Sequence, residues 1–273
     1  MRVVLNGELL DGQDARLSAL DEGLLYGYGL FETIRALDGH MPLLERHLDR
    51  LFSGAVRLGL PVRRERAAIA RDLEALLAAE GFADARVRVT LTRGAALLGE
   101  GSTLLATAQP YALPAPPYDL CVVSGHPGGS FPLAGLKTIG YLPHLLARDR
   151  ARAAGHHDAL WLDAGGRVVE ATTGNVFVVL PDGTVVTPPL SAGPLAGVGR
   201  AWAIARLRDE GATVQEAPLR AAHLSQAREV FLTNALMGAM PVRRLDGRML
   251  PAIAPDGWGL RLREAFADLF RAR

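Results

Sequence analysis

Apolar residues recur at two different spacings along the chain, and each spacing predicts a different element. After Pro42 they recur every three or four positions, which predicts a helix with one apolar stripe, made of Leu44, Leu48, Leu51, Ala55 and Leu58. A second helix is predicted from about residue 65 to 80, where Gly81 ends the pattern. Between 86 and 93 apolar and polar residues alternate, which predicts a strand.

Shorter patterns of the same kinds fill the rest of the chain. Further helices are predicted at about 143–154 and at about 258–271. Another is predicted to begin in the stretch Pro194–Arg200 and to end at about residue 210. Further strands are predicted at 2–5, 8–10, 103–109, 120–124, 159–163, 167–170, 175–180, 184–187 and 228–233. Helices and strands mix without strict alternation, so we predict an α/β (α+β) fold.

One proline-rich stretch, 110–118, separates two groups of elements. It holds four prolines in eight residues, and proline cannot donate to a sheet ladder. We therefore predict a smaller N-terminal α/β domain at 1–109, a linker at 110–118, and a larger, β-rich C-terminal domain at 119–273.

Composition and charge narrow the class of protein. Charges of both signs are interspersed and the formal net charge is +1, which argues against a nucleic-acid surface. Cys121 is the single cysteine, so we expect no disulfide framework and no cysteine-based metal site, and we assign no metal ligands. The N-terminus has no signal-peptide pattern and no apolar run approaches membrane-spanning length, so we expect a cytoplasmic protein.

Lys137 is the only lysine of the chain, in the stretch Gly135-Leu-Lys-Thr-Ile-Gly-Tyr141. Arginine keeps its proton, whereas a buried lysine can lose its proton, act as a base and form a Schiff base. A Schiff-base lysine usually serves pyridoxal phosphate, a cofactor that acts as an electron sink. The alternative is a surface lysine that was retained by chance.

Three other features offer what pyridoxal phosphate needs from a protein. Glu170, in a predicted strand, could pair with a pyridine nitrogen, although an acid in a strand more often faces solvent. Gly197-Val-Gly199 begins a predicted helix and offers backbone N–H groups to an anion. Arg50 borders the apolar stripe of the first predicted helix, from which its guanidinium could bind a phosphate.

Three longer segments resemble the class IV, or fold type IV, pyridoxal-phosphate enzymes. They are Lys137-Thr-Ile-Gly-Tyr-Leu-Pro143, His157-Asp-Ala-Leu-Trp-Leu-Asp163 and Gly166-Arg-Val-Val-Glu-Ala-Thr-Thr-Gly-Asn-Val-Phe177. Shorter matches occur in the family's order at Phe31–Arg35, His47–Leu51 and Gly197–Arg200. The resemblance therefore covers nearly the whole chain. It implies a two-domain pyridoxal-phosphate enzyme that acts on a small-molecule amino substrate as a homodimer.

The resemblance also implies roles for single residues in binding the cofactor. Lys137 would form the Schiff base and carry the catalytic proton, and Glu170 would keep the pyridine nitrogen protonated. Arg50 would bind the phosphate together with the backbone N–H groups of Val198 and Gly199.

The remaining assignments concern the phosphate turn and the substrate. Related aminotransferases commonly place a hydroxyl on the phosphate at the position of Ala235, which has none, so that contact is either absent or replaced by Asn234. Tyr26 and Arg88 are assigned to the substrate side of the pocket.

Two stretches bear on the choice of substrate. After Leu91–Gly94 the D-amino-acid aminotransferases carry an Arg and a His that bind the substrate carboxylate, whereas this chain continues Ala-Ala-Leu-Leu-Gly-Glu. Thr233–Val242 is similar to the corresponding stretch of 4-amino-4-deoxychorismate lyase, although an Arg-Gly pair common in the lyases is missing after Gly94. We therefore expect the lyase, which forms 4-aminobenzoate and pyruvate in folate biosynthesis, with a branched-chain or other class IV aminotransferase as the alternative.

The apolar, Gly-rich loop 95–102 bears on assembly. Leu97 and Leu98 are unusual choices for a free surface loop, so we expect them at a subunit contact. The alternative is that both side chains pack under their own domain.

Overall fold

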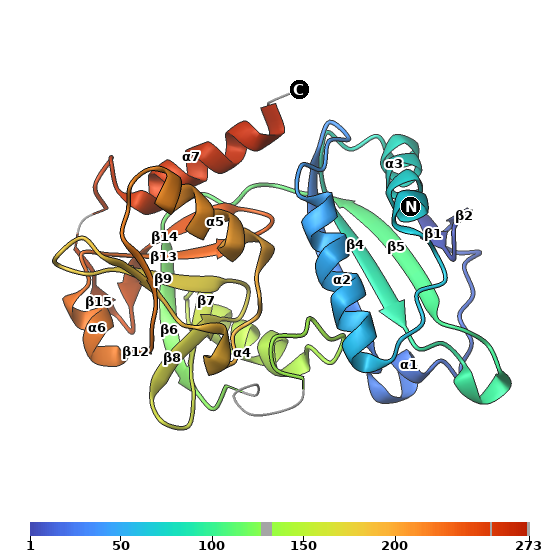
Figure 1. Cartoon of the computed structure of the whole chain (residues 1–273), viewed down its shortest axis with the longest axis horizontal. Coiled ribbons are helices and arrows are strands. Elements are labelled where there is room, and N and C mark those ends of the chain that lie inside the picture. The colour runs from blue at the N-terminus through green and yellow to red at the C-terminus, as the bar shows by residue number, and fades with distance from the viewer. Residues whose placement is uncertain (127–132, 252, 272–273) are drawn as a thin grey trace. The chain divides into compact units, whose positions relative to one another are not determined.

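The computed structural model describes residues 1–126, 133–251 and 253–271. Helices and strands mix throughout the chain, which confirms the predicted α/β (α+β) class (Figure 1). The elements form two compact units, of which the first comprises Met1–Leu113 and Leu136–Gly140. The second comprises the other described residues from Pro114 onward. The segment that carries Lys137 is thus grouped with the first unit, whereas the sequence-based division places it in the domain 119–273.

The first unit is built on a five-stranded antiparallel sheet with the strand order β2-β1-β5-β4-β3. The strands are β1 (Arg2–Leu5), β2 (Glu8–Asp11), β3 (Gly29–Leu37), β4 (Asp84–Thr92) and β5 (Thr103–Pro110). The helices are α1 (Glu22–Tyr26), α2 (Leu44–Leu58), α3 (Arg66–Glu80) and the single 3₁₀ turn η1 (Ala96–Leu98).

Helices α2 and α3 cover one face of this sheet. Their buried side chains pack with Ile34, Val87 and Val89 from the strands. Helix α2 buries the predicted stripe, because Leu48, Leu51 and Ala55 are each 1% exposed. The helix ends at Gly59, whose φ of 63° is the left-handed conformation that glycine adopts without steric cost.

The second unit is built on a ten-stranded mixed sheet with the order β11-β10-β9-β13-β14-β6-β7-β8-β12, and β15 pairs with β14. The first strands are β6 (Tyr118–Ser124), β7 (Asp158–Leu162), β8 (Arg167–Ala171), β9 (Asn175–Val179) and β10 (Val185–Thr187). The later strands are β11 (Val214–Glu216), β12 (Leu219–Arg220), β13 (Glu229–Asn234), β14 (Gly238–Leu245) and β15 (Arg248–Met249). The helices are α4 (Leu142–Ala153), the 3₁₀ turn η2 (Leu190–Ala192), α5 (Val198–Asp209), α6 (Ala221–Gln226) and α7 (Trp258–Arg271).

The large sheet is covered by helices as well as by loops. Helices α5 and α7 pack on β13 and β14, and α4 packs on β6 and β7. Phe177 of β9 stacks on Phe231 of β13 with ring centroids 5.1 Å apart, and Trp202 of α5 meets Phe266 of α7 edge to face. None of the described helices is both long enough and apolar enough to cross a membrane.

Candidate active site

Lys137 lies on a segment that extends the edge of the small sheet. The edge strand is β3, where the N–H of Phe31 donates to the carbonyl of Lys137 at 2.9 Å. The N–H of Ile139 donates in turn to the carbonyl of Gly29 at 3.0 Å. These two hydrogen bonds fix the backbone immediately after Lys137 to β3. Its Nζ lies 4.4 Å from the centroid of the Phe31 ring.

Within the first unit, Lys137 and Arg50 line the same recess. Its other lining residues come from β3, α2 and the lysine segment, and they are Leu30, Phe31, Glu32, Leu51, Gly54 and Leu136. The amine of Lys137, the guanidinium of Arg50 and the carboxylate of Glu32 therefore lie on one recess.

Arg50 is held by an acid that the sequence analysis did not single out. Its Nε donates to Oε1 of Glu32 at 2.8 Å and its Nη2 donates to Oε2 at 2.6 Å. The Nδ1 of His47 lies 2.7 Å from the same Oε2, and because a carboxylate only accepts, His47 donates there. Glu32 and His47 are each 1% exposed. We call these three residues the Glu32 cluster.

The Glu32 cluster has a defined charge distribution. Burial acts to raise the pKa of Glu32, but the charge of Arg50 and the hydrogen bonds from Arg50 and His47 outweigh it and lower the pKa to about 2. Burial lowers the pKa of His47, and the positive charges of Arg50 and Lys137 act in the same direction against the influence of Glu32. The cluster therefore pairs an ionised Glu32 with Arg50, beside a neutral His47.

The two residues assigned to the substrate have different surroundings. Arg88, on β4, lies with its Cζ 3.9 Å from the centroid of the Phe31 ring, so Arg88 and Lys137 both contact one aromatic side chain. Burial, and then the charge of Arg86, lower the pKa of the Arg88 guanidinium. Tyr26 lies at the end of α1 and is 73% exposed, so within its own unit it contributes to no buried site.

In the second unit, Glu170 is buried on β8 and does not face solvent. Its Oε2 accepts hydrogen bonds from the N–H of Leu195 at 3.0 Å and from Nδ2 of Asn175 at 3.3 Å. Asn175 is fixed by a second donation, to the carbonyl of Leu195 at 2.9 Å. The strand therefore presents a carboxylate of set orientation.

The start of α5 carries backbone N–H groups that the sequence predicts as donors to a phosphate. The described residues assign no acceptor to the N–H groups of Val198 and Gly199, as expected of the first turn of a helix. Gly199 packs closely on the turn after β13, because a Cβ there would lie 2.6 Å from the carbonyl carbon of Asn234. Only glycine allows this approach, so the helix start and the Asn234 turn form one packed structure.

The side chain of Asn234 holds this turn together. Its Oδ1 accepts from the N–H groups of Leu236 and Met237 at 3.0 and 2.9 Å, and its Nδ2 donates to the carbonyl of Thr173 at 3.0 Å. These bonds are made within the turn and to the loop after β8. Asn234 therefore shapes the turn from its side chain, in addition to any contact with a phosphate.

Asp158 fixes the loop that follows Glu170. It is buried at the start of β7, and it accepts hydrogen bonds from the hydroxyls of Thr172 and Thr173 and from the N–H of Ala159. Burial raises the pKa of Asp158, while these hydrogen bonds oppose the rise. Since Asn234 binds the carbonyl of Thr173, a continuous polar network connects β7, β8 and the Asn234 turn. Asp158 lies in the segment His157–Asp163 that resembles the family, but the sequence did not indicate that its side chain fixes the loop after Glu170.

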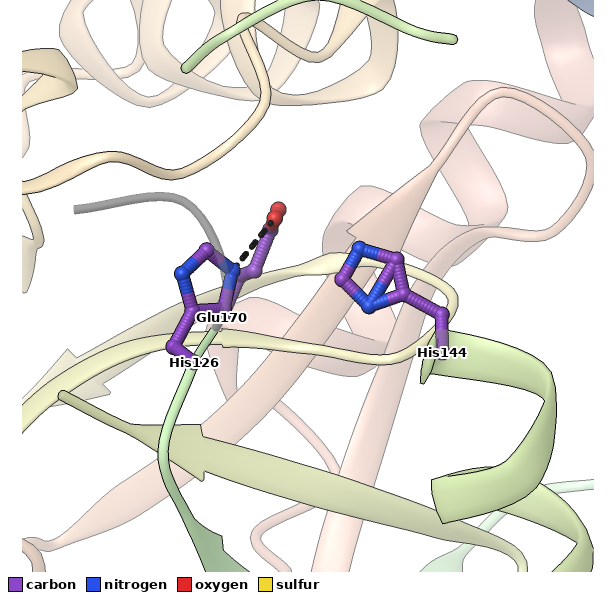
Figure 2. A group of neighbouring side chains, drawn as sticks. All are labelled: His126, His144 and Glu170. Carbon is purple, nitrogen blue, oxygen red and sulfur yellow. Dashed lines mark hydrogen bonds and ion pairs between the residues drawn. The ribbon is translucent and has the colours of Figure 1, made fainter. Parts of the chain in front are cut away.

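A second group that the sequence analysis missed surrounds the other oxygen of Glu170. The Nε2 of His126 lies 3.3 Å from Oε1, and the ring of His144 lies close by, at the start of α4 (Figure 2). Ligand atoms of the three residues lie within 4.8 Å of one another, a spacing that could also hold a metal ion. We interpret the 3.3 Å contact between His126 and Glu170 as a long hydrogen bond.

Comparison with known proteins identifies the family. The model of the class IV amino-transferases matches residues 29–245 of the chain. This chain belongs to the class IV aminotransferase family. A putative branched-chain-amino-acid aminotransferase of Methanocaldococcus jannaschii is 32% identical over 98% of this chain and 96% of its own length. The aminodeoxychorismate lyase of Bacillus subtilis is 28% identical over 89% of this chain and 86% of its own length.

Solved structures agree with that membership. The branched-chain aminotransferase of Thermoproteus uzoniensis, with norvaline, superposes with a TM-score of 0.88 at 28% identity, over 99% of this chain and 93% of its own. The T.th. branched-chain amino acid aminotransferase, complexed with N-(5'-phosphopyridoxyl)-L-glutamate, gives a TM-score of 0.89 at 25% identity, over 100% of this chain and 95% of its own. The chain thus has the fold type IV architecture and is a pyridoxal-phosphate-dependent enzyme of the class IV aminotransferases.

Each unit, taken by itself, carries groups of a kind that this cofactor requires. The first unit supplies a primary amine and a fixed guanidinium on one recess, Lys137 and Arg50. The second supplies a buried, ionisable acid at Glu170 and the unpartnered N–H groups of Val198 and Gly199. An amine, an acid for a ring nitrogen and donors for a phosphate are the groups that pyridoxal phosphate requires.

Proposed function

We propose that the enzyme is an aminotransferase for amino acids with apolar side chains, of the branched-chain type. The observation that carries the proposal is whole-length similarity to branched-chain aminotransferases in both sequence and structure. The comparisons support this reading better than the lyase expected from the sequence.

The stretch that favoured the lyase has a structural explanation. Met237, Met240 and Val242 of the segment Thr233–Val242 are at most 3% exposed and belong to the core of the second unit. Asn234 is engaged in capping its own turn. Core packing therefore accounts for these residues without reference to a substrate.

We assign the cofactor roles in this enzyme as the resemblance implies. Lys137 binds the cofactor covalently and, once released by the amino substrate, moves the proton at the substrate's α-carbon. Arg50, Val198 and Gly199 bind the phosphate, and Glu170 holds the proton of the ring nitrogen. When bound, pyridoxal phosphate supplies an electron sink for the charge that develops at the α-carbon.

Arg88 is our candidate for the substrate carboxylate. It shares the Phe31 ring with Lys137, and its partial burial strengthens an ion pair with a carboxylate relative to water. The loop after Gly94 supports an apolar substrate, since Leu97 and Leu98 are 75% and 57% exposed and carry no charge. Tyr26 remains a candidate for the substrate side on the resemblance alone.

The test is to incubate the purified enzyme with pyridoxal phosphate, 2-oxoglutarate and, in separate reactions, L-leucine, L-valine and D-alanine. Keto acid from leucine and valine, with little from D-alanine, is the expected result. Arg88→Gln should then raise KM by about 10-fold or more, with a smaller change in kcat, because a charge-assisted hydrogen bond is lost. An enzyme that converts D-alanine best, or an Arg88→Gln variant with an unchanged KM, would contradict the proposal.

Aminodeoxychorismate lyase is the second candidate, favoured by 28% identity with the Bacillus subtilis enzyme. The two activities begin with the same proton removal by Lys137, but the lyase releases pyruvate and an aromatic amine and needs no keto-acid acceptor. Formation of 4-aminobenzoate from aminodeoxychorismate without 2-oxoglutarate would favour this candidate. Leucine-dependent glutamate formation in the same preparation would favour the aminotransferase.

A further inference from the structure

The two oxygens of Glu170 have different partners. Oε2 is occupied by the N–H of Leu195 and the amide of Asn175. Oε1 faces the Nε2 of His126 at 3.3 Å. The first pair of bonds sets the position of one oxygen, and His126 is the described contact that sets the rotation of the carboxylate about its own axis.

The surroundings of His126 keep its ring in one orientation. The side chain is 3% exposed. Its ring lies edge-on to Trp161, with centroids 6.0 Å apart and planes at 82°, and is tilted by 39° to His144 at 5.8 Å. Trp161 comes from β7 and His144 from α4, and Figure 2 shows the His126 ring turned to the Glu170 carboxylate. A histidine held this way is a directed donor.

We propose that His126 is a positioning residue for Glu170: its Nε2–H fixes Oε1 so that the carboxylate retains the proton of the cofactor's ring nitrogen. The inference rests on the pyridoxal-phosphate site and on the role of Glu170, and it holds for either choice of substrate. The contact between Nε2 and Oε1 restrains the orientation of the carboxylate. Two titratable groups, Glu170 and His144, place an oxygen or a ring nitrogen within 4.8 Å of a ring nitrogen of His126.

Two replacements of His126 separate the hydrogen bond from the packing. Gln carries an amide N–H at about the reach of Nε2, whereas Leu fills similar space without a donor. His126→Leu should weaken the binding of pyridoxal phosphate to the apoenzyme by about 10-fold or more, as a lost hydrogen bond to a charged group does, and His126→Gln should restore most of it. The measurement is titration of the cofactor into the apoenzyme, followed by tryptophan fluorescence. His40→Leu, at an exposed turn of the first unit, is the matched control and should bind as the wild type does.

A double-mutant cycle with Glu170→Gln identifies the route of the effect. If His126 acts through the carboxylate, His126→Leu should change the cofactor dissociation constant by less than about 2-fold in the Glu170→Gln background. The pH dependence of the bound cofactor's visible spectrum should shift in His126→Leu and return in His126→Gln. Neither readout depends on substrate, so failure here is distinguishable from failure of the proposed aminotransferase activity.

Three results would overturn the proposal. They are unchanged cofactor binding and spectrum in His126→Leu, equal losses in the Leu and Gln variants, and effects of His126→Leu and Glu170→Gln that simply add. Circular dichroism of each variant establishes that it is folded. Addition of Zn²⁺ to the holoenzyme is the final control, and displacement of the cofactor by the ion would show instead that His126, His144 and Glu170 form a metal site.

Discussion

Replacing Glu32 with Gln tests the buried cluster that fixes Arg50. The pKa of Glu32 is lowered from 4.5 to about 2 in the folded protein, and each unit of such a shift corresponds to about 1.4 kcal/mol. The ionised form therefore stabilises the fold by about 3 kcal/mol. Removing one partner of a buried ion pair costs about 3–5 kcal/mol, which agrees in size. We expect Glu32→Gln to lose about 3 kcal/mol of unfolding free energy at pH 7.

The pH dependence gives the prediction its sign. Because the folded pKa is depressed, the contribution of Glu32 is complete above the unfolded value of 4.5 and is lost as the pH falls towards 2. The contribution of Glu32 itself to the difference between wild type and Glu32→Gln should thus be complete at pH 7 and should shrink below about 4.5. His47 adds a separate loss in the wild type as the pH falls below 6.5, since its pKa is lowered in the fold.

Urea unfolding of the apoenzyme at pH 7, 5 and 4 measures these differences. The matched control is Asp84→Asn, which breaks a two-bond ion pair with Arg35 in the same sheet. Its loss should be smaller, because the Asp84 side chain is 22% exposed, whereas that of Glu32 is 2% exposed. A loss below about 1 kcal/mol in Glu32→Gln at pH 7, or a loss no larger than that of Asp84→Asn, would refute the reasoning.

Three further predictions concern the cofactor and assembly. Glu170→Gln should keep the fold and slow turnover by about 10- to 150-fold, because a neutral amide cannot hold the ring proton by charge; an unchanged kcat would remove Glu170 from the mechanism. Gly199→Ala should raise the dissociation constant of pyridoxal phosphate in a fluorescence titration, since its Cβ would lie 2.6 Å from the Asn234 backbone, and normal binding would show that the α5 start does not contact the phosphate. We also propose a homodimer with contacts through η1. The double variant Leu97→Asp, Leu98→Asp should fold but form a weaker dimer, as measured by light scattering. A wild-type protein that is monomeric at micromolar concentration would exclude the homodimer.

Much of the fold followed from local patterns, and the exceptions have identifiable causes. Helix α2 and strand β4 were predicted because their apolar spacing is strong and each buries one face. Strand β14 was not predicted, because Gly238 and Pro241 interrupt its pattern and its stability comes from pairing with β13 and β6. Tertiary pairing of this kind leaves no local signal.

In the candidate site, too, some residues were predicted from the sequence and others were not. Lys137, Arg50 and Glu170 stood out because their residue types match the cofactor's chemistry. The partners that hold them did not, because Glu32 meets Arg50 only when α2 packs on β3, and His126 meets Glu170 only across the sheet of the second unit. Asn234 was predicted at the right turn, but its hydrogen bonds within that turn depend on backbone geometry.

The central claim is that Lys137 binds pyridoxal phosphate covalently, and borohydride reduction of the holoenzyme followed by peptide mass spectrometry tests it most directly. Since Lys137 is the only lysine, the N-terminal amine of Met1 is the only other primary amine of the chain. We predict a phosphopyridoxyl group on the peptide that contains Lys137, loss of the visible absorbance on reduction, and neither result in Lys137→Arg. A reduced cofactor on the N-terminal peptide, or a Lys137→Arg variant that keeps both the label and wild-type turnover, would contradict the account.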